Sequence, residues 1–364
     1  MLLKELHIRD FRNIAEASLI FTEGVNLLYG NNAEGKTNAL EAIYYFARGK
    51  SFRTPRDTDL IREGRDFFSL DLRYTEGEKE KKLAYRIAKK EKIREKNGIR
   101  VSSPSEMIGH FRAVLFCPEH LSLVKGSPEE RRAFLNIGIS QCYPSYIPLY
   151  ASYMKVLDNR NSLLKMAQKG YYVDREELYV WSEKLSEYAA HIYAYRKDYI
   201  NKIAAYARPY LYELSDGKED MTLLYESDIE GECDPFTVYK RKATENMERE
   251  IAVGYSLYGI HRDDLDIRIG ERSSRVFASQ GQQRSIVLSL KEAEGEVSRD
   301  CSGEYPVFLY DDVLSELDEK RQQRLLYGSG KKQIIVTSCN EEHFGDSVKN
   351  RIYTKGGQYA SAHR

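Results

Sequence analysis

The stretch GNNAEGKT, from Gly30 to Thr37, has the residue types and spacing of a phosphate-binding loop, G-x-x-x-x-G-K-[ST]. Glycines let such a loop wrap phosphate oxygens with backbone N–H groups, Lys36 can reach the β- and γ-phosphates, and the Thr37 hydroxyl can bind Mg²⁺. The apolar run VNLLYG predicts a buried strand before the loop, and a helical apolar pattern begins at Lys36. We therefore expect nucleotide phosphates to bind along the whole loop: Gly30, Asn31, Asn32, Ala33, Glu34, Gly35, Lys36 and Thr37.

Two acidic residues end a second apolar run, VFLYDD, at Asp311 and Asp312. Carboxylates at the end of a buried strand are costly unless they meet cations, and a phosphate-binding loop needs such a partner for its metal ion. We expect Asp311 to contact Mg²⁺ or one of its waters, and Asp312 to orient and polarise an attacking water. The alternative is a strand end with two solvated acids.

A polar loop containing a glycine opens the helical pattern of FASQGQQRSIVLSLKEAE. Its residues are Ser279, Gln280, Gly281, Gln282 and Gln283. Taken in isolation, the loop is explained equally well by a serine that caps a helix N-terminus.

The elements that position these residues alternate between strand and helix at both ends of the chain, which predicts an α/β core. From about Pro128 to Leu214 the pattern is helical, and its last part, from Arg175, can form one helix of about 60 Å. In KIREKNGIRV, Asn97-Gly98 predicts a type I′ hairpin. We expect a head built from residues 1–125 and 221–364, interrupted by a helical arm at 126–220.

The bulk composition is that of an ordinary globular protein of 364 residues, with a formal net charge of zero, so any basic surface must be local. The first residues show no apolar leader pattern, and no run approaches the roughly 18 apolar residues of a membrane span. The five cysteines form no CxxC pair, which argues against a zinc site or a disulfide framework and favours a reducing, cytoplasmic setting.

The order of these motifs resembles that of the ATP-binding-cassette ATPases, and within them the Rad50/SMC-like branch. The resemblance is greatest to the RecF family of bacterial recombination mediators. It covers nearly the whole chain and includes FRN at Phe11–Asn13, PEHLSLVKGSPEERRAFLN at Pro118–Asn136, HRDDL at His261–Leu265 and LYDDVLSELD at Leu309–Asp318. It implies an α/β ATPase head of this type with an inserted helical arm, and ATP with Mg²⁺ as the ligands.

The resemblance also implies an ATP-dependent homodimer in which each active site is shared. The γ-phosphate held by Lys36 of the other copy would face Ser279 and the N–H groups of Gly281 and Gln282. Gln280 would belong to the same nucleotide-binding loop. The catalytic residues would then be Lys36, Asp312 and, acting in trans, Ser279. SELD at Ser315–Asp318 matches the loop that crosses the same interface. HRDD at His261–Asp264 matches the family without an assigned role.

Two positions depart from the family pattern. Where relatives carry a glutamine that binds Mg²⁺, the chain has FCPE with Glu119, and where they carry a histidine after QIIVT, it has Thr337 and Ser338. His343 lies beyond that strand and is expected at the surface. A site that contacts the γ-phosphate without an imidazole fits slow turnover. We therefore expect a weak, DNA-stimulated ATPase in which ATP acts as a timer for dimerisation.

Basic residues suggest DNA, both single-stranded and duplex, as a partner bound without sequence preference. Residues 79–100 contain ten basic and three acidic residues, which suits a phosphate-tracking hairpin, with a solvated hairpin as the alternative. The candidate contacts are Arg53, Arg56, Arg62, Arg65, Lys89 and Lys90. Half of the 28 tyrosines lie between residues 143 and 212, where packing between helices is a better explanation than base stacking.

The family resemblance implies a role in recombinational repair, with RecA loading at gaps and duplex/single-strand junctions together with RecR and RecO. One alternative is the ATPase subunit of a membrane transporter, but the LSGGQ loop, the glutamine loop and the switch histidine of that class are missing or altered here. Another is a DNA clamp that binds nucleotide without hydrolysis, against which the intact Asp311-Asp312 pair argues.

Overall fold

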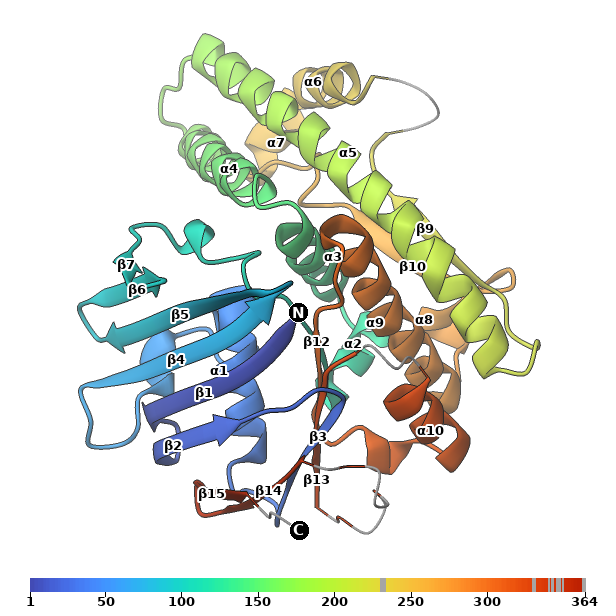
Figure 1. Ribbon diagram of the computed structural model, residues 1–364. Coiled ribbons are helices and arrows are strands. Elements are labelled where there is room, and N and C mark those ends of the chain that lie inside the picture. Colours follow the sequence, from blue (N-terminus) through green and yellow to red (C-terminus); the bar gives the residue numbers. More distant parts are fainter. Residues whose placement is uncertain are drawn as a thin grey trace. The chain divides into compact units, whose positions relative to one another are not determined.

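The computed structural model describes residues 1–229, 234–328, 332–339, 341, 344, 348 and 350–361 (Figure 1). The chain divides into two compact units. The first unit comprises Met1–His120 and Val287–Arg364, and the second comprises Leu121–Ile286. The expected α/β architecture is present in the first unit, which combines β-sheets with helix α1 (Lys36–Arg48).

The first unit contains two six-stranded sheets. The antiparallel sheet has the order β2-β1-β4-β5-β6-β7. Its strands are β1 (Leu2–Phe11), β2 (Ile14–Ile20), β4 (Phe67–Glu76), β5 (Lys79–Ala88), β6 (Lys92–Lys96) and β7 (Ile99–Arg100). The other sheet has the order β15-β14-β3-β13-β12-β8 and is parallel except for β15. Its strands are β3 (Val25–Tyr29), β8 (Ala113–Phe116), β12 (Val307–Tyr310), β13 (Ile334–Ser338), β14 (Asn350–Lys355) and β15 (Gln358–Ser361).

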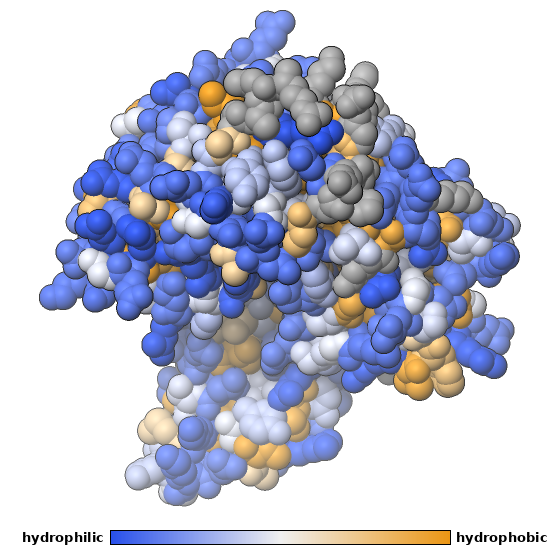
Figure 2. Space-filling model, turned by 90° about the horizontal axis from the view of Figure 1, so that it is seen from below, coloured by the Kyte–Doolittle hydropathy of each residue, from blue (hydrophilic) through white to orange (hydrophobic). Residues whose placement is uncertain are grey.

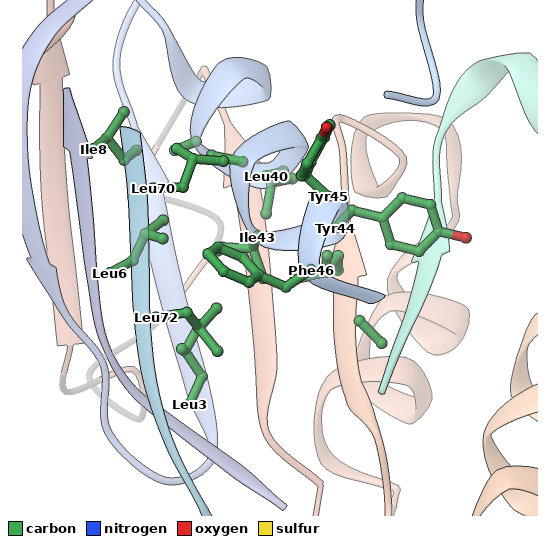
Figure 3. Packing of buried hydrophobic residues seen from close by; sticks show 14 of the residues in the cluster. Leu3, Leu6, Ile8, Leu40, Ile43, Tyr44, Tyr45, Phe46, Leu70 and Leu72 are labelled. Atoms are coloured by element: carbon green, nitrogen blue, oxygen red, sulfur yellow. The ribbon is translucent and has the colours of Figure 1, made fainter. Parts of the chain in front are cut away.

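Helix α1 (Lys36–Arg48) lies between these two sheets, as Figure 3 shows. Its buried residues include Leu40, Ile43 and Phe46, which pack with β1 and β4 residues such as Leu6 and Leu72. The same hydrophobic cluster includes apolar residues of β3, β8, β12 and β13. Burial of α1 on both sides fixes the start of the helix, and therefore the loop before it, relative to the parallel sheet.

The parallel register brings the candidate nucleotide residues to one edge of the sheet. β13 pairs with both β3 and β12, and the carboxyl ends of parallel strands meet at the same edge, where open α/β sheets bind ligands. The loop after β3, the carboxylates after β12 and Thr337 near the end of β13 are therefore neighbours. The first unit is completed by the 3-10 turns η1 (Asp57–Leu60), η2 (Pro104–Glu106), η3 (Pro118–Leu121) and η4 (Leu314–Glu316) and by α10 (Glu319–Tyr327).

The predicted hairpin turn between β6 and β7 is confirmed. Asn97 and Gly98 both have positive φ, 50° and 80°, which is the requirement of a type I′ turn.

The second unit is mainly helical and has one small antiparallel sheet. Its helices are α2 (Ser122–Lys125), α3 (Pro128–Cys142), α4 (Tyr146–Gln168), α5 (Arg175–Leu214), α6 (Pro235–Glu245), α7 (Met247–Val253) and α8 (Ser274–Phe277). The sheet has the order β11-β10-β9, from β9 (Met221–Glu226), β10 (Asp264–Ile269) and β11 (Arg272–Ser273). The long helix expected from Arg175 to Leu214 is present as one helix of 40 residues. Helix α9 (Gln280–Ser302) begins in this unit and continues into the first.

The boundaries of the units differ from the expected head and arm. Residues 221–286, which the strand–helix alternation assigned to the head, group with the helices, because β9 packs along α5 and forms a separate sheet with β10. Alternation along the sequence shows that strands are present, but not which sheet they join.

Several tyrosines of the second unit pack inside it, whereas others, such as Tyr171 and Tyr172, are exposed. Tyr146, Tyr153 and Tyr199 are fully buried, and Tyr193 stacks on Tyr225 with ring centroids 5.4 Å apart. No helix of the described residues is sufficiently long and apolar for a membrane span, and Figure 2 shows a face that is mainly hydrophilic with scattered apolar residues.

The HRDD segment, which had no assigned role, places its two aspartates in ion pairs within the second unit. The Asp263 carboxylate accepts a hydrogen bond from Tyr225 and lies 3.5 Å from the fully buried Arg196 guanidinium. Asp264 binds both Nε and Nη2 of Arg131, at 2.6 and 2.8 Å. These charges are buried but paired, so the segment ties α3 and α5 to the start of β10.

We expect Asp263→Ala to destabilise the protein by about 3 kcal/mol, because the substitution leaves the Arg196 guanidinium buried without its carboxylate. Asp263→Asn, which keeps hydrogen-bond acceptors, should cost less. Denaturant unfolding measures both effects. Equal unfolding midpoints for Asp263→Ala and the unmodified protein would contradict this structural role.

Candidate nucleotide-binding site

The loop between β3 and α1 adopts a conformation that depends on its glycines. Gly30 has φ of 152°, and a Cβ there would stand 2.2 Å from the Thr354 carbonyl oxygen. Gly35 has φ of 114° and immediately precedes α1. Both positions lie in the backbone region that only glycine occupies without strain. The loop is therefore built to bring backbone close to a ligand at the N-terminus of a helix.

Lys36 points back into its own loop. Its Nζ donates hydrogen bonds to the carbonyl oxygens of Gly30 and Asn31, at 2.6 and 2.8 Å, and the residue is 6% exposed. Within the described chain, no carboxylate lies at ion-pair distance from this ammonium. The cation is therefore available to an anion that enters the loop.

Asp311, immediately after β12, bonds two threonine hydroxyls. Its Oδ1 accepts hydrogen bonds from the hydroxyls of Thr37 and Thr337, each at 2.9 Å. Burial raises the pKa of Asp311, and the two hydroxyls partly oppose this effect. A buried carboxylate beside a threonine hydroxyl offers the oxygen ligands that Mg²⁺ takes together with nucleotide phosphates. The residues present therefore fit a magnesium ion.

Asp312 occupies a different position from its neighbour. It is exposed, has a positive φ of 55°, and its N–H donates to the Thr337 hydroxyl at 2.9 Å. A left-handed aspartate is uncommon and is maintained by such surroundings. The turn buries Asp311 and leaves Asp312 at the wall of the pocket.

The pocket at this edge has a volume of about 360 Å³, within the usual range for ligand sites. Its lining includes predicted residues and three that were not assigned to it from the sequence. The predicted ones are Asn32, Ala33, Gly35, Lys36, Thr37, Asp312 and Thr337, and the additional ones are Asn13, Asn38 and Arg53. Arg53 Nη1 donates to Asn38 Oδ1 and Asn38 Nδ2 donates to Asn13 Oδ1, each at 2.8 Å. Of these three residues, Asn13 belongs to the FRN motif, so the sequence resemblance could have indicated it as a site residue.

The residues at the two positions that depart from the family pattern lie in different surroundings. Thr337 lies in the site and bonds both Asp311 and the Asp312 backbone. Glu119 is exposed in η3, close enough for its charge to raise the pKa of Asp311. Ser315 donates from its hydroxyl to the Asp312 carbonyl at 3.1 Å. His343 lies outside the described residues.

The polar segment Ser279–Gln283 forms the N-terminus of α9, with Ser279, Gln280 and Gly281 exposed and Gln283 buried. The Ser279 N–H donates to Gln282 Oε1 at 2.8 Å, and the Gln282 N–H donates to Ser279 Oγ at 3.3 Å. This reciprocal pair is a capping box. Gln283 Nε2 adds a bond to the Ala278 carbonyl at 2.7 Å. The capping interpretation thus accounts for Ser279, Gln282 and Gln283, while Gln280 and Gly281 are exposed and have no such role.

The basic hairpin is less basic at its surface than its sequence suggests. Five of its ten cations are paired with nearby acids: Lys81 with Glu76, Lys82 and Arg86 with Asp71, Lys92 with Asp57, and Arg100 with Glu91. Lys89 and Lys90 are exposed at the β5–β6 turn, without an ion pair in the described chain. Arg62 and Arg65 lie 3.9 and 3.3 Å from Asp10.

Comparison with known proteins gives a consistent match over nearly the full length. Residues 2–358 match the family model of the RecF/RecN/SMC N-terminal domain. The chain is 37% identical over 355 residues to the DNA replication and repair protein RecF of Ruminiclostridium cellulolyticum, covering 95% of each. It is similar to the solved structure of the recombination mediator protein RecF-ATP in the RecFOR pathway, with a TM-score of 0.92, 32% identity, and coverage of 99% of this chain and 97% of that one.

A third similarity concerns the fold alone. An SMC head bound to the C-terminal winged-helix domain of ScpA has a TM-score of 0.60 at 17% identity, and the match covers 99% of this chain and 97% of that one.

Proposed function

The chain belongs to the RecF family, and from that premise we propose that it is an ATP-dependent DNA-binding protein of recombinational repair and replication restart, acting in the cytoplasm. ATP binding closes a homodimer on DNA at gaps and duplex/single-strand junctions. The closed dimer promotes RecA loading with RecR and RecO, and slow hydrolysis reopens it. Family membership does not favour the alternative of a transporter ATPase subunit.

The observation that carries the dimer is the environment of Gly281. Apart from its chain neighbours and the backbone of its own helix, no atom of the described residues lies within 4 Å of where its Cβ would stand, and its φ is not positive. It lies in the first turn of α9, where glycine is a poorer helix former than alanine by up to about 1 kcal/mol. Neither packing nor backbone conformation in the described part of the chain explains the glycine, whereas close approach of another molecule does.

The other molecule is a second copy carrying ATP. The Ser279 hydroxyl and the N–H groups at the start of α9 form an exposed, positively polarised helix end, which suits a γ-phosphate. The capping box holds these groups in place before the partner arrives, so little conformational entropy is lost on closure. The Ser315–Asp318 segment, next to Asp312, would cross the same interface.

The other half of each site is the pocket around Lys36. There Lys36 would leave its two carbonyl partners to neutralise the β- and γ-phosphates. Asp312, at the pocket wall, would accept a proton from the attacking water and orient it. Mg²⁺, held by Thr37 and Asp311, would neutralise charge on the phosphates. Thr337 bonds the Asp311 carboxylate and the Asp312 backbone but offers no imidazole to the γ-phosphate, which is consistent with weak, DNA-stimulated hydrolysis.

DNA would bind through its backbone on the antiparallel sheet of the first unit. The ion pair of Lys92 with Asp57, at 2.6 Å, brings the β5–β6 hairpin beside the arginine-rich segment after α1. The proposed contacts are Arg56, Arg62, Arg65, Lys89 and Lys90, with Arg53 at the margin of the nucleotide pocket. Such contacts predict salt-sensitive binding without sequence preference.

Sedimentation of the unmodified protein and Gly281→Ala tests this function. With ATP, and more strongly with ATP and gapped DNA, the unmodified protein should dimerise, whereas ADP should leave it monomeric. Gly281→Ala should keep or raise the thermal midpoint, yet dimerise at least about tenfold more weakly, because its methyl group enters the space needed by the partner. Unimpaired dimerisation of Gly281→Ala, or a monomer in every condition, would contradict the proposal.

A further inference from the structure

The C-terminal hairpin formed by β14 and β15 holds the phosphate-binding loop. β14 runs parallel to β3, with Tyr353 opposite Tyr29, the last residue before the loop. This register brings the Thr354 carbonyl against Gly30, where there is no room for a Cβ. The hairpin turn, Gly356-Gly357, reaches the far end of the same loop.

Three hydrogen bonds join the hairpin to that far end. The Gly357 N–H donates to the Glu34 carbonyl oxygen at 2.8 Å, and the Gly356 N–H donates to the Glu34 carboxylate. The Tyr359 hydroxyl donates to the Gly35 carbonyl oxygen at 2.8 Å. Gly357 is itself confined, because a Cβ there would stand 2.7 Å from the Asn13 carbonyl oxygen.

Two of these contacts use backbone carbonyl groups of the loop, the third uses the Glu34 carboxylate, and none of the three uses a loop N–H. In a trans peptide the C=O of one residue and the N–H of the next point in opposite directions. Holding the Glu34 carbonyl on the hairpin therefore turns the Gly35 N–H the other way, and holding the Gly35 carbonyl does the same for the Lys36 N–H. A phosphate-binding loop needs these N–H groups to face its ligand.

We propose that the β14–β15 hairpin is a clamp that presets the peptide planes of the phosphate-binding loop, with Tyr359 as a positioning residue for nucleotide binding. The inference rests on the proposed function, since it assumes that the loop binds ATP. It adds that affinity for the phosphates depends on a side chain outside the pocket, more than 300 residues along the chain. Each peptide plane that is already oriented reduces the conformational entropy lost when the nucleotide binds.

Tyr359→Phe tests the clamp, because it removes one hydrogen bond and keeps the ring. The matched control is Tyr353→Phe on β14, a tyrosine that is 39% exposed and whose hydroxyl bonds nothing in the described chain. Calorimetric titration with ADP separates loop binding from dimerisation, which requires ATP. Tyr359→Phe should bind ADP about three- to tenfold more weakly with an unchanged thermal midpoint, and Tyr353→Phe should match the unmodified protein.

Hydrogen exchange gives a second measurement on the unmodified protein. By linkage, ADP should slow exchange of the Gly356 and Gly357 amides, because ligand and hairpin stabilise the same loop conformation. The clamp is overturned if ADP affinity is equal in the two variants, if the loss in Tyr359→Phe accompanies a general loss of thermal stability, or if ADP leaves both amides unchanged. Failure of the unmodified protein to bind any nucleotide would instead overturn the function.

Discussion

Lys36→Ala should reduce ATP affinity at least about a hundredfold and abolish ATP-dependent dimerisation. The ammonium is the buried cation of the loop, now shared between two carbonyl oxygens at 2.6 and 2.8 Å. Charge-assisted hydrogen bonds to phosphate each contribute about 1.5–3 kcal/mol, so loss of two of them accounts for this factor. Calorimetric titration with ATP and sedimentation measure the two effects.

The matched control for this change is Lys50→Ala, since Lys50 is an exposed lysine beyond the C-terminus of α1. It should bind ATP as the unmodified protein does. If Lys36→Ala kept its ATP affinity within a few-fold, the assignment of the nucleotide pocket would be wrong.

Ser279→Arg should bind ATP within about threefold of the unmodified affinity and yet remain monomeric. The serine is exposed at the N-terminus of α9, and an arginine there would fill the space that the second copy needs. It would also remove the cap hydroxyl, at a cost of about 1 kcal/mol in helix stability. Ser162→Arg, at an exposed position on α4, controls for the added charge and should still dimerise. A Ser279→Arg protein that dimerises with ATP would refute the in-trans role.

The parts of the fold that could be predicted are those encoded by local patterns. Contiguous sequence patterns predict the loop from Gly30 to Thr37, the strand before Asp311 and the 40-residue helix α5. The turn at Asn97-Gly98 is of the same kind, because two residues with positive φ dictate one turn type. The order of the motifs then indicated the family, and the family resemblance implied the roles of the site residues.

What could not be predicted depends on contacts between residues far apart in the chain. Nothing near Tyr359 or Gly357 in sequence indicates that they bond Glu34 and Gly35. Four of the ten cations of the basic hairpin pair with acids on β4 and η1, which a count within residues 79–100 misses. Arg196 and Asp263 likewise meet only in the folded second unit.

The loop before α9 shows how the two kinds of information combine. Its sequence left a helix cap and a functional loop equally plausible, and the structure shows that Ser279 caps the helix through a reciprocal pair with Gln282. The cap does not compete with the proposed function, because it fixes the loop that the second copy would meet. Gly281 separates the two explanations, since a cap does not need it.

The most direct test of the shared site is to mix Lys36→Ala with Ser279→Arg and measure ATP-dependent dimerisation and ATP turnover. Neither variant alone can form a complete site, but a mixed dimer joins the intact loop of the second to the intact Ser279 of the first. The shared-site account predicts that the mixture dimerises and hydrolyses ATP more than either variant alone, with a maximum at equal proportions. Both effects should stay below those of the unmodified protein, because the second site of the mixed dimer carries both substitutions. A mixture that stays monomeric and as inactive as its components would contradict it.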